Sequence, residues 1–135
     1  NTIQFLQAHS YEDCRKRFPG KYIPPYGRLF VAYQAVELCA CVALAPFTKT
    51  ICEIQTLFVR PAFRGQGIGK TLVNHVIVTA QDIGYHHMRL DTLAFMRGAQ
   101  ALYRSLGFVP IEPYLDGAGE LQPHIRYFEL NLNQA

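Results

Sequence analysis

The segment from Val59 to Lys70, with the sequence VRPAFRGQGIGK, most constrains how this chain folds. An apolar run precedes it, and a helical periodicity begins near Gly67. Glycines at alternate positions leave backbone amides uncovered where a helix N-terminus concentrates partial positive charge. Three cations surround the same place, namely Arg60, Arg64 and Lys70. This strand, loop and helix therefore predict a binding site for a pyrophosphate or a similar anion.

Two well-known phosphate-binding motifs do not fit this loop. A Walker A loop ending at Gly69-Lys70-Thr71 would need a glycine where Arg64 stands, which disfavours a nucleotide hydrolase. The dinucleotide fingerprint would need a third glycine where Lys70 stands. The pattern that does fit is Arg-x-x-Gly-x-Gly, at Arg64, Gly67 and Gly69. A plain tight turn between a strand and a helix remains the alternative interpretation.

Length and composition indicate one compact domain over residues 1–135. Half of the residues are hydrophobic and only 17% are charged, which argues against disorder. The net charge of +3 is too small to indicate a nucleic-acid partner. We see no signal peptide and no apolar stretch near 18 residues, so we expect a cytoplasmic protein without a membrane partner.

The cysteines do not show the spacing of a metal site or a disulfide framework. Cys39 and Cys41 alternate on one predicted strand, Cys52 lies on the next, and Cys14 is remote in the sequence. The simplest interpretation is that these are reduced, mostly buried thiols. We therefore expect no metal cofactor.

The hydrophobic periodicity predicts a mixed α/β layered fold. The opening segment to about Arg17 is predicted to be helical, and residues 21–27 to be a packed loop. Strands are predicted over 28–33, 37–45, 51–59, 88–92, 108–111 and 125–132. Helices are predicted from near Gly67 to Ile83, and over 96–106. Strand 37–45 is apolar on both faces, with Cys39 and Ala40 on opposite sides, so both faces of the sheet should be covered.

Further motifs accompany the loop. Cys52-Glu53-Ile54 leads into Leu57-Phe58-Val59-Arg60-Pro61, and Leu90-Asp91-Thr92-Leu93 is followed by Ala101-Leu102-Tyr103-Arg104-Ser105-Leu106-Gly107-Phe108. With the loop, these motifs resemble the GCN5-related N-acetyltransferase (GNAT) family over most of residues 19–132. The resemblance implies a single-domain, mostly antiparallel sheet with helices on both faces and splayed central strands. The family usually opens with a strand that we do not see here, which leaves open whether the first strand is missing.

The resemblance also implies acetyl-CoA as cosubstrate and assigns roles to residues. The strand residues Leu57, Phe58 and Val59 would pair with the pantetheine arm. The loop would hold the pyrophosphate through Arg64, Gly65, Gln66, Gly67, Ile68, Gly69 and Lys70. Glu53 would draw a proton from the amine, unless water or another residue is the base. Tyr103 would protonate the departing thiolate. The alternatives are a paired surface glutamate and a tyrosine that only packs on the sheet.

The implied activity is that of an N-acetyltransferase acting on a primary amine by direct attack in a ternary complex. We expect a small-molecule acceptor, because the irregular loops predicted over 22–26 and 113–123 carry aromatic and acidic residues, among them Tyr22, Tyr26, Tyr114 and Asp116. Those aromatics also fit a role in packing the loops. Two other functions stay open: an acyl-CoA-binding or interaction module with little catalysis, and a peptide or protein N-acetyltransferase. A homodimer is one open option for assembly.

Overall fold

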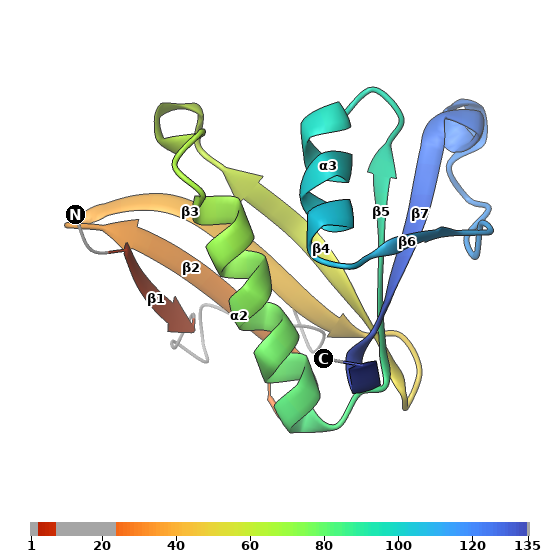
Figure 1. Ribbon diagram of the computed structural model, residues 1–135, viewed down its shortest axis with the longest axis horizontal. Helices are drawn as coiled ribbons and strands as arrows, with labels where there is room; N and C mark the ends of the chain where they lie inside the picture. Colours follow the sequence, from red (N-terminus) through yellow and green to blue (C-terminus); the bar gives the residue numbers. More distant parts are fainter. Residues whose placement is uncertain (1–2, 8–23, 135) are drawn as a thin grey trace.

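The computed structural model describes residues 3–7 and 24–134, which it arranges around one seven-stranded sheet (Figure 1). The order across the sheet is β1-β2-β3-β4-β5-β7-β6, and neighbouring strands are antiparallel except β4 and β5. The strands are β1 (Ile3–Gln7), β2 (Arg28–Gln34), β3 (Glu37–Pro46), β4 (Ile51–Val59), β5 (His87–Leu93), β6 (Val109–Ile111) and β7 (Ile125–Asn131). A mixed, mostly antiparallel sheet is the fold class that the sequence predicts.

The helices are α2 (Ile68–Ile83) and α3 (Arg97–Ser105), with the short 3-10 helices η1 (Pro61–Phe63), η2 (Gly119–His124) and η3 (Leu132–Gln134). The predicted bounds of β4 are confirmed, and α2 ends where predicted. Gly84 ends this helix with a left-handed φ of 109°, and its N–H donates to the carbonyls of Ala80 and Gln81. The loop predicted over 113–123 contains η2, which the sequence pattern does not predict.

The prediction of a helix through the opening segment is wrong for Ile3–Gln7. These residues form β1, which pairs antiparallel with β2 and adds a strand at the edge of the sheet. Pairing with β2 gives the backbone of this short segment hydrogen bonds that local propensity does not report. The opening strand that the sequence pattern does not show is therefore present. The rest of the predicted helix, up to Arg17, lies outside the described residues.

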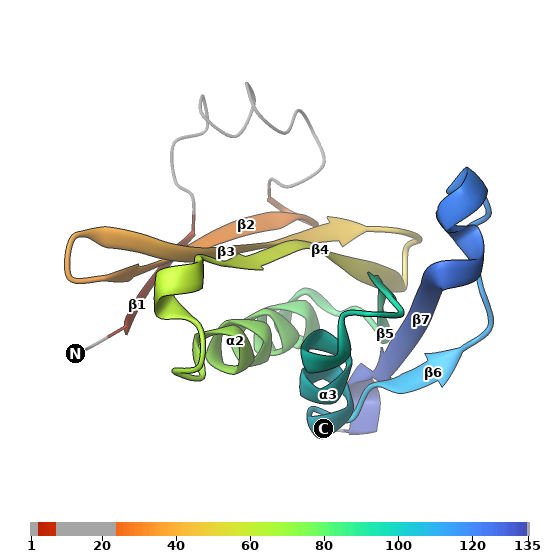
Figure 2. The ribbon, with the colours of Figure 1, turned by 90° about the horizontal axis from the view of Figure 1, so that it is seen from above.

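Helix α2 packs across one face of the sheet, beneath β2, β3 and β4 (Figure 2). Its buried stripe consists of Ile68, Leu72, Val73, Val76 and Ala80. Helix α3 lies on the same side and adds Tyr103 to the same core cluster. Both faces of the sheet were predicted to be covered, and the described helices α2 and α3 lie on this one.

A β-bulge in β3 changes the predicted facing of one cysteine. The pairs Leu38–Tyr33 and Ala40–Ala32 leave Cys39 as an extra residue between them. Cys39 therefore joins the same core cluster as Ala40, whereas strict alternation assigned it to the opposite face. The described cysteines are free thiols: Cys39, Cys41 and Cys52. Cys14 lies outside the described residues.

Candidate active site

The two central strands β4 and β5 part from each other soon after they begin to pair. Their parallel ladder covers only Ile51–Glu53 on β4 and His87–Arg89 on β5. In Figure 1 the two strands meet near their starts and separate toward their ends. Beyond Glu53, β4 continues to pair with β3 but no longer with β5. The predicted splay is therefore present, and it leaves one backbone edge of β4 available to a ligand.

A second irregularity lies on β4 at the splay. Between the pairs Ala43–Gln55 and Cys41–Phe58, β3 contributes one residue and β4 contributes two, so β4 bulges at Thr56 and Leu57. Thr56 has a φ of 54°, which is rare for a β-branched residue. Backbone held in such a conformation is frequent at ligand sites, where a bulge re-aims a strand.

A cavity of about 480 Å³ occupies the space between the parted strands. Its walls come from β4, β5, α3 with the residue before it, the first residue of β7 and the loop after β6. The lining residues are Glu53, Ile54, Gln55, Thr56, Leu57, Leu90, Asp91, Thr92, Leu93, Met96, Ala99, Tyr103, Leu115 and Ile125. The splay thus brings together Glu53 and Tyr103, which are 50 positions apart in the sequence.

Glu53 is 8% exposed and holds a fixed position in this cavity. Its Oε2 accepts a hydrogen bond of 2.8 Å from the Tyr114 hydroxyl, and its Oε1 accepts one of 2.9 Å from Gln55 Nε2. A buried carboxylate needs such partners, because burial without hydrogen bonds is costly. Burial and then the Glu53 carboxylate raise the pKa of Tyr114 above its ordinary value, so its hydroxyl remains a donor.

The Tyr114 ring is held from several sides. It contacts Phe47 with ring centroids 5.3 Å apart and Tyr127 with centroids 5.1 Å apart, both at steep angles. The Arg89 guanidinium lies 4.9 Å from its centroid. Arg89 in turn forms an ion pair of 2.8 Å with Glu129 on β7. Tyr114 is therefore a fixed partner of Glu53 and not a loose loop residue.

Asp91 is the second carboxylate that lines the cavity. It lies on β5 two residues after Arg89, which is paired with Glu53, so it belongs to the same face of the sheet. Its side chain remains exposed. Partial burial and then the negative charge of Glu53 raise the pKa of Asp91. The two acidic side chains therefore influence each other across the cavity.

Tyr103 reaches the cavity from α3, on the core side of the sheet. It is 6% exposed and packs edge-on against Phe108 with ring centroids 5.7 Å apart. Burial, and then the charge of Asp91, raise the pKa of Tyr103 to about 12. Its hydroxyl is thus protonated at neutral pH and available to donate a proton.

The Gly-rich loop leads into α2 as the sequence predicts. Gly65 and Gly67 have left-handed φ values of 82° and 79°, which other residues adopt only with strain. Gly67 is the N-cap residue of α2 and has no side chain that could accept a hydrogen bond. The N–H groups of the first helical turn therefore receive no side-chain cap from this position. A Cβ at Gly69 would lie 3.6 Å from Leu102, an ordinary contact. The left-handed turns, more than packing, require glycine here.

The cations around the loop have different settings. Arg64 donates through Nε to the Val59 carbonyl at 2.9 Å and lies over the Phe58 ring. Arg60 donates to the Leu38 carbonyl at 2.7 Å. Lys70 is exposed on the first turn of α2. Arg64 therefore shapes the loop as well as contributing charge.

A hollow of about 450 Å³ runs beside this loop. It is lined by the predicted strand residues Leu57, Phe58 and Val59 and by Arg64, Gly65, Gly67, Ile68 and Gly69, together with residues of α3. Gln66 is exposed beside it and accepts a hydrogen bond of 3.4 Å from Gln34. The hollow and the cavity share Leu57, Met96 and Ala99. One continuous path thus runs from the loop to Glu53.

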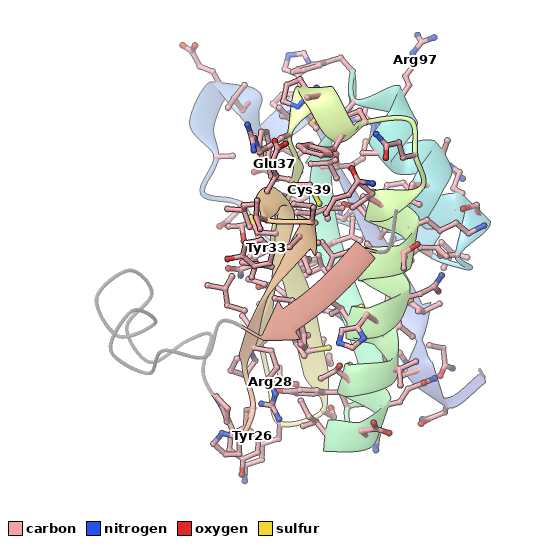
Figure 3. The ribbon with its side chains drawn as sticks, turned by 90° about the vertical axis from the view of Figure 1, so that its left-hand side faces the viewer. Tyr26, Arg28, Tyr33, Glu37, Cys39 and Arg97 are labelled. Atoms are coloured by element: carbon pink, nitrogen blue, oxygen red, sulfur yellow. The ribbon has the colours of Figure 1, made fainter. Side chains whose placement is uncertain are left out.

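The residues predicted for the acceptor side are not all brought together. Tyr114 contacts Glu53, as described above. Asp116 is exposed and does not line the cavity. Tyr26 lies at the opposite end of the molecule from Arg97, the first residue of α3 (Figure 3). Tyr22 lies outside the described residues.

Sequence reasoning missed three features of this site. Sequence reasoning gave Asp91 no role beyond its place in a motif, although its carboxylate lies on a predicted strand between the apolar residues of the core. Gln55 lies two residues from Glu53 on the same strand, which could have suggested their contact. The bulge at Thr56 left no signal, because threonine does not favour a left-handed φ.

No group of three or more histidine, cysteine or acidic residues is placed to hold a metal ion among residues 3–7 and 24–134. None of the described helices has the length and apolar character needed to cross a membrane.

Comparison with known proteins agrees with this geometry. A model of the acetyltransferase (GNAT) family matches residues 3–108. An uncharacterized N-acetyltransferase of Schizosaccharomyces pombe is 37% identical over 116 residues, which cover 84% of this chain and 69% of that protein. An uncharacterized N-acetyltransferase of Escherichia coli is 33% identical over 106 residues, covering 76% of this chain and 63% of that protein. The chain thus spans less than two thirds of the second relative.

A solved structure shares the fold. It is a GNAT family acetyltransferase from Elizabethkingia anophelis with acetyl-CoA bound, and it superposes with a TM-score of 0.73 at 23% identity. The superposition covers 97% of this chain and 99% of that one. The family match covers most of the chain, and both relatives are named N-acetyltransferases. This chain is a member of the acetyltransferase (GNAT) family.

Proposed function

We propose that this chain transfers the acetyl group of acetyl-CoA to a primary amine of a small molecule, by direct attack in a ternary complex. One observation carries the proposal most: the cavity between β4 and β5 contains both Glu53 and Tyr103 and joins the hollow beside the Gly-rich loop. A thioester and an amine that entered from opposite ends would meet between a carboxylate and a phenol.

The loop and the start of α2 suit the coenzyme. Uncapped helix amides, the left-handed Gly65 and Gly67, and the charges of Arg64 and Lys70 favour a pyrophosphate at this position. The unpaired edge of β4 from Leu57 to Val59 suits the amide groups of a pantetheine arm. Gln66, Ile68 and Gly69 complete the loop. The acetyl-CoA bound to the Elizabethkingia protein supports this choice of cosubstrate.

The chemistry follows from the groups along this path. The acceptor ammonium loses one proton to Glu53, directly or through water, and becomes a nucleophile. Its nitrogen attacks the thioester carbonyl, and backbone N–H groups of β4 stabilise the negative charge on oxygen. The carbon–sulfur bond then breaks, and the thiolate takes the Tyr103 proton. The nitrogen of the new amide then gives its surplus proton to Tyr103, and Glu53 releases the first proton to solvent.

The size and charge of the cavity favour a small cationic acceptor over a protein surface. Both charged residues that line its described walls, Glu53 and Asp91, are acidic. Two alternatives compete with this proposal: a coenzyme-binding module with little catalysis, and an enzyme acting on peptide or protein N-termini. The fixed contacts of Glu53 favour catalysis, because a binding module has no use for a buried carboxylate at the end of the coenzyme path.

The test is turnover of acetyl-CoA with a panel of amines, followed by release of free thiol. The proposal predicts product with one or more polyamines, amino sugars or amino acids. Acetylation restricted to peptide N-termini would favour the second alternative. Tight coenzyme binding without turnover on any amine would favour the first.

A further inference from the structure

The acidic character of the cavity points to a narrower class of acceptor. Glu53 and Asp91 lie on the same face of two neighbouring strands, one on each side of the splay. Asp91 lies about 7 Å further along β5 than the residue opposite Glu53, given the usual rise of a strand. This spacing is comparable to the length of a short alkyl chain.

The cations around these carboxylates do not neutralise the cavity. Arg89, the residue paired with Glu53, forms its ion pair with Glu129 and covers the Tyr114 ring. The described residues that line the cavity include no lysine, arginine or histidine. Partial burial, and then the negative charge of Glu53, raise the pKa of Asp91.

The two carboxylates differ in their partners. Glu53 is buried and accepts hydrogen bonds on both oxygens, from Gln55 and Tyr114. The Asp91 side chain is exposed and forms no hydrogen bond or ion pair that the described residues record. Glu53 is therefore placed to accept a proton as the base, whereas Asp91 is available to bind a charged group of the ligand.

The positive charge that Asp91 would hold cannot be on the reacting amine at the moment of attack, because this amine must be neutral to be a nucleophile. A charge that stays on the substrate has to be a second one. Several of the other residues that line the cavity have apolar side chains that suit methylene groups, among them Leu57, Leu93, Met96, Leu115 and Ile125. This inference rests on the proposed function and narrows its substrate class.

We propose that the acceptor is a short aliphatic diamine and that Asp91 binds its second, non-reacting ammonium group. One amine meets the thioester beside Glu53 and gives up its proton. The other stays protonated and forms a charge-assisted hydrogen bond with Asp91. Asp91 is thus the residue that selects for a second positive charge.

The test compares three amines of matched length with acetyl-CoA held constant: putrescine, butylamine and γ-aminobutyrate. Their far ends are positive, neutral and negative. We expect kcat/KM to be highest for putrescine and lower by about 10- to 100-fold for butylamine, the range of one hydrogen bond to a charged group. The wild-type protein alone tests this order, so no variant has to fold. Diamines with more methylene groups then locate the preferred length.

The variant Asp91→Asn is expected to lose the preference for putrescine over butylamine, chiefly because its KM for putrescine rises. The kcat at saturating amine should change less than the KM does, because Glu53 and Tyr103 remain. Asp82→Asn is the matched control, since Asp82 lies at the far end of the molecule beside Tyr26. Coenzyme affinity, measured by calorimetry, should be unchanged in both variants.

The outcomes separate the two proposals. If butylamine and putrescine react equally and Asp91→Asn changes neither, the diamine proposal is overturned while the acetyltransferase proposal stands. If no amine is acetylated although the coenzyme binds, the acetyltransferase proposal fails, and the diamine proposal fails with it.

Discussion

The Tyr114 hydroxyl donates a hydrogen bond of 2.8 Å to Glu53 Oε2, joining a loop after β6 to the middle of β4. The Tyr127 hydroxyl holds the same loop by a 2.9 Å hydrogen bond to the Leu115 carbonyl. The loop is thus anchored at two consecutive residues, and the first anchor is the proposed base itself. Tyr114 therefore acts on the chemistry through the position of Glu53.

Replacing Tyr114 by Phe removes this hydrogen bond and keeps the ring contacts. We expect kcat to fall by about tenfold or more, since a buried carboxylate loses one of its two partners. The KM for acetyl-CoA should not change, because Tyr114 is remote from the Gly-rich loop. Steady-state kinetics with each substrate varied in turn measure both constants.

Two further variants show whether Tyr114 acts through Glu53. Glu53→Gln alone should lower kcat, and adding Tyr114→Phe to it should cause little further loss, because their interaction is already gone. Tyr127→Phe is the control, because it loosens the same loop without touching Glu53. Equal losses in Tyr114→Phe and Tyr127→Phe would mean that loop order alone matters.

Tyr103→Phe tests the proposed acid. The pKa of about 12 keeps the hydroxyl protonated through the neutral range, so its proton is available at every pH where activity is assayed. We expect turnover to fall by about 100- to 10,000-fold, the usual contribution of a proton-transfer group. Coenzyme affinity by calorimetry should change little. A variant with full turnover at all pH values would remove Tyr103 from the mechanism, and Tyr33→Phe controls for loss of a phenol elsewhere.

Substitutions at Gly67 test the coenzyme loop. Asn and Asp have nearly the same shape, and both tolerate a left-handed φ better than most residues do. Gly67→Asp adds a negative charge beside the expected pyrophosphate, whereas Gly67→Asn does not. We expect the Asp variant to lose coenzyme binding and the Asn variant to retain part of it. Equal affinities by calorimetry would place the pyrophosphate elsewhere.

The sequence predicted the regular elements well because their signals are local. Strand β4 has the predicted bounds, and Gly84 marks the end of α2 through its left-handed cap. The loop at Gly65 and Gly67 was predictable for the same reason, since only glycine adopts these turns easily.

What sequence could not predict depends on partners distant in the chain. Strand β1 exists because β2 offers it an edge, and the bulge at Cys39 reversed a facing that alternation had assigned. Tyr114 was expected to contact the acceptor, and only the fold reveals that its hydroxyl binds Glu53. Asp91 has no role until the splay opens a cavity that it shares with Glu53.

Thr56 and Ala35 have positive φ values of 54° and 57°. Residues with a Cβ atom adopt such values only with backbone strain, whereas glycine does not. Replacement by Gly relieves this strain, so each variant should be more stable by about 1 kcal/mol. Urea unfolding measures this change. Ala35 lies in the turn between β2 and β3, so its replacement should not alter turnover. Thr56→Gly makes the backbone of the bulge next to Leu57 more flexible at the proposed active site. We therefore expect turnover to fall while stability rises. Loss of stability in both variants would contradict the assigned strain.

Asp91 also predicts how stability depends on pH. Because its pKa is raised on folding, the folded chain holds this proton to a higher pH than the unfolded chain does. The free energy of unfolding therefore falls as pH rises from the ordinary aspartate value through the raised one. Asp91→Asn cannot ionise, so it should be more stable than the wild type at neutral pH. The difference in free energy of unfolding between the two proteins should vanish well below about pH 4, where the wild-type carboxyl is protonated in both the folded and the unfolded state. The neighbouring groups Glu53, Tyr103, Tyr114 and Arg89 are present in both proteins, so the two differ only at position 91. Urea unfolding from acid to neutral pH measures the difference, with Asp82→Asn as the control for loss of a surface carboxylate. If the difference in free energy of unfolding between Asp91→Asn and the wild type stayed constant over the whole pH range, ionisation of Asp91 would not be its cause.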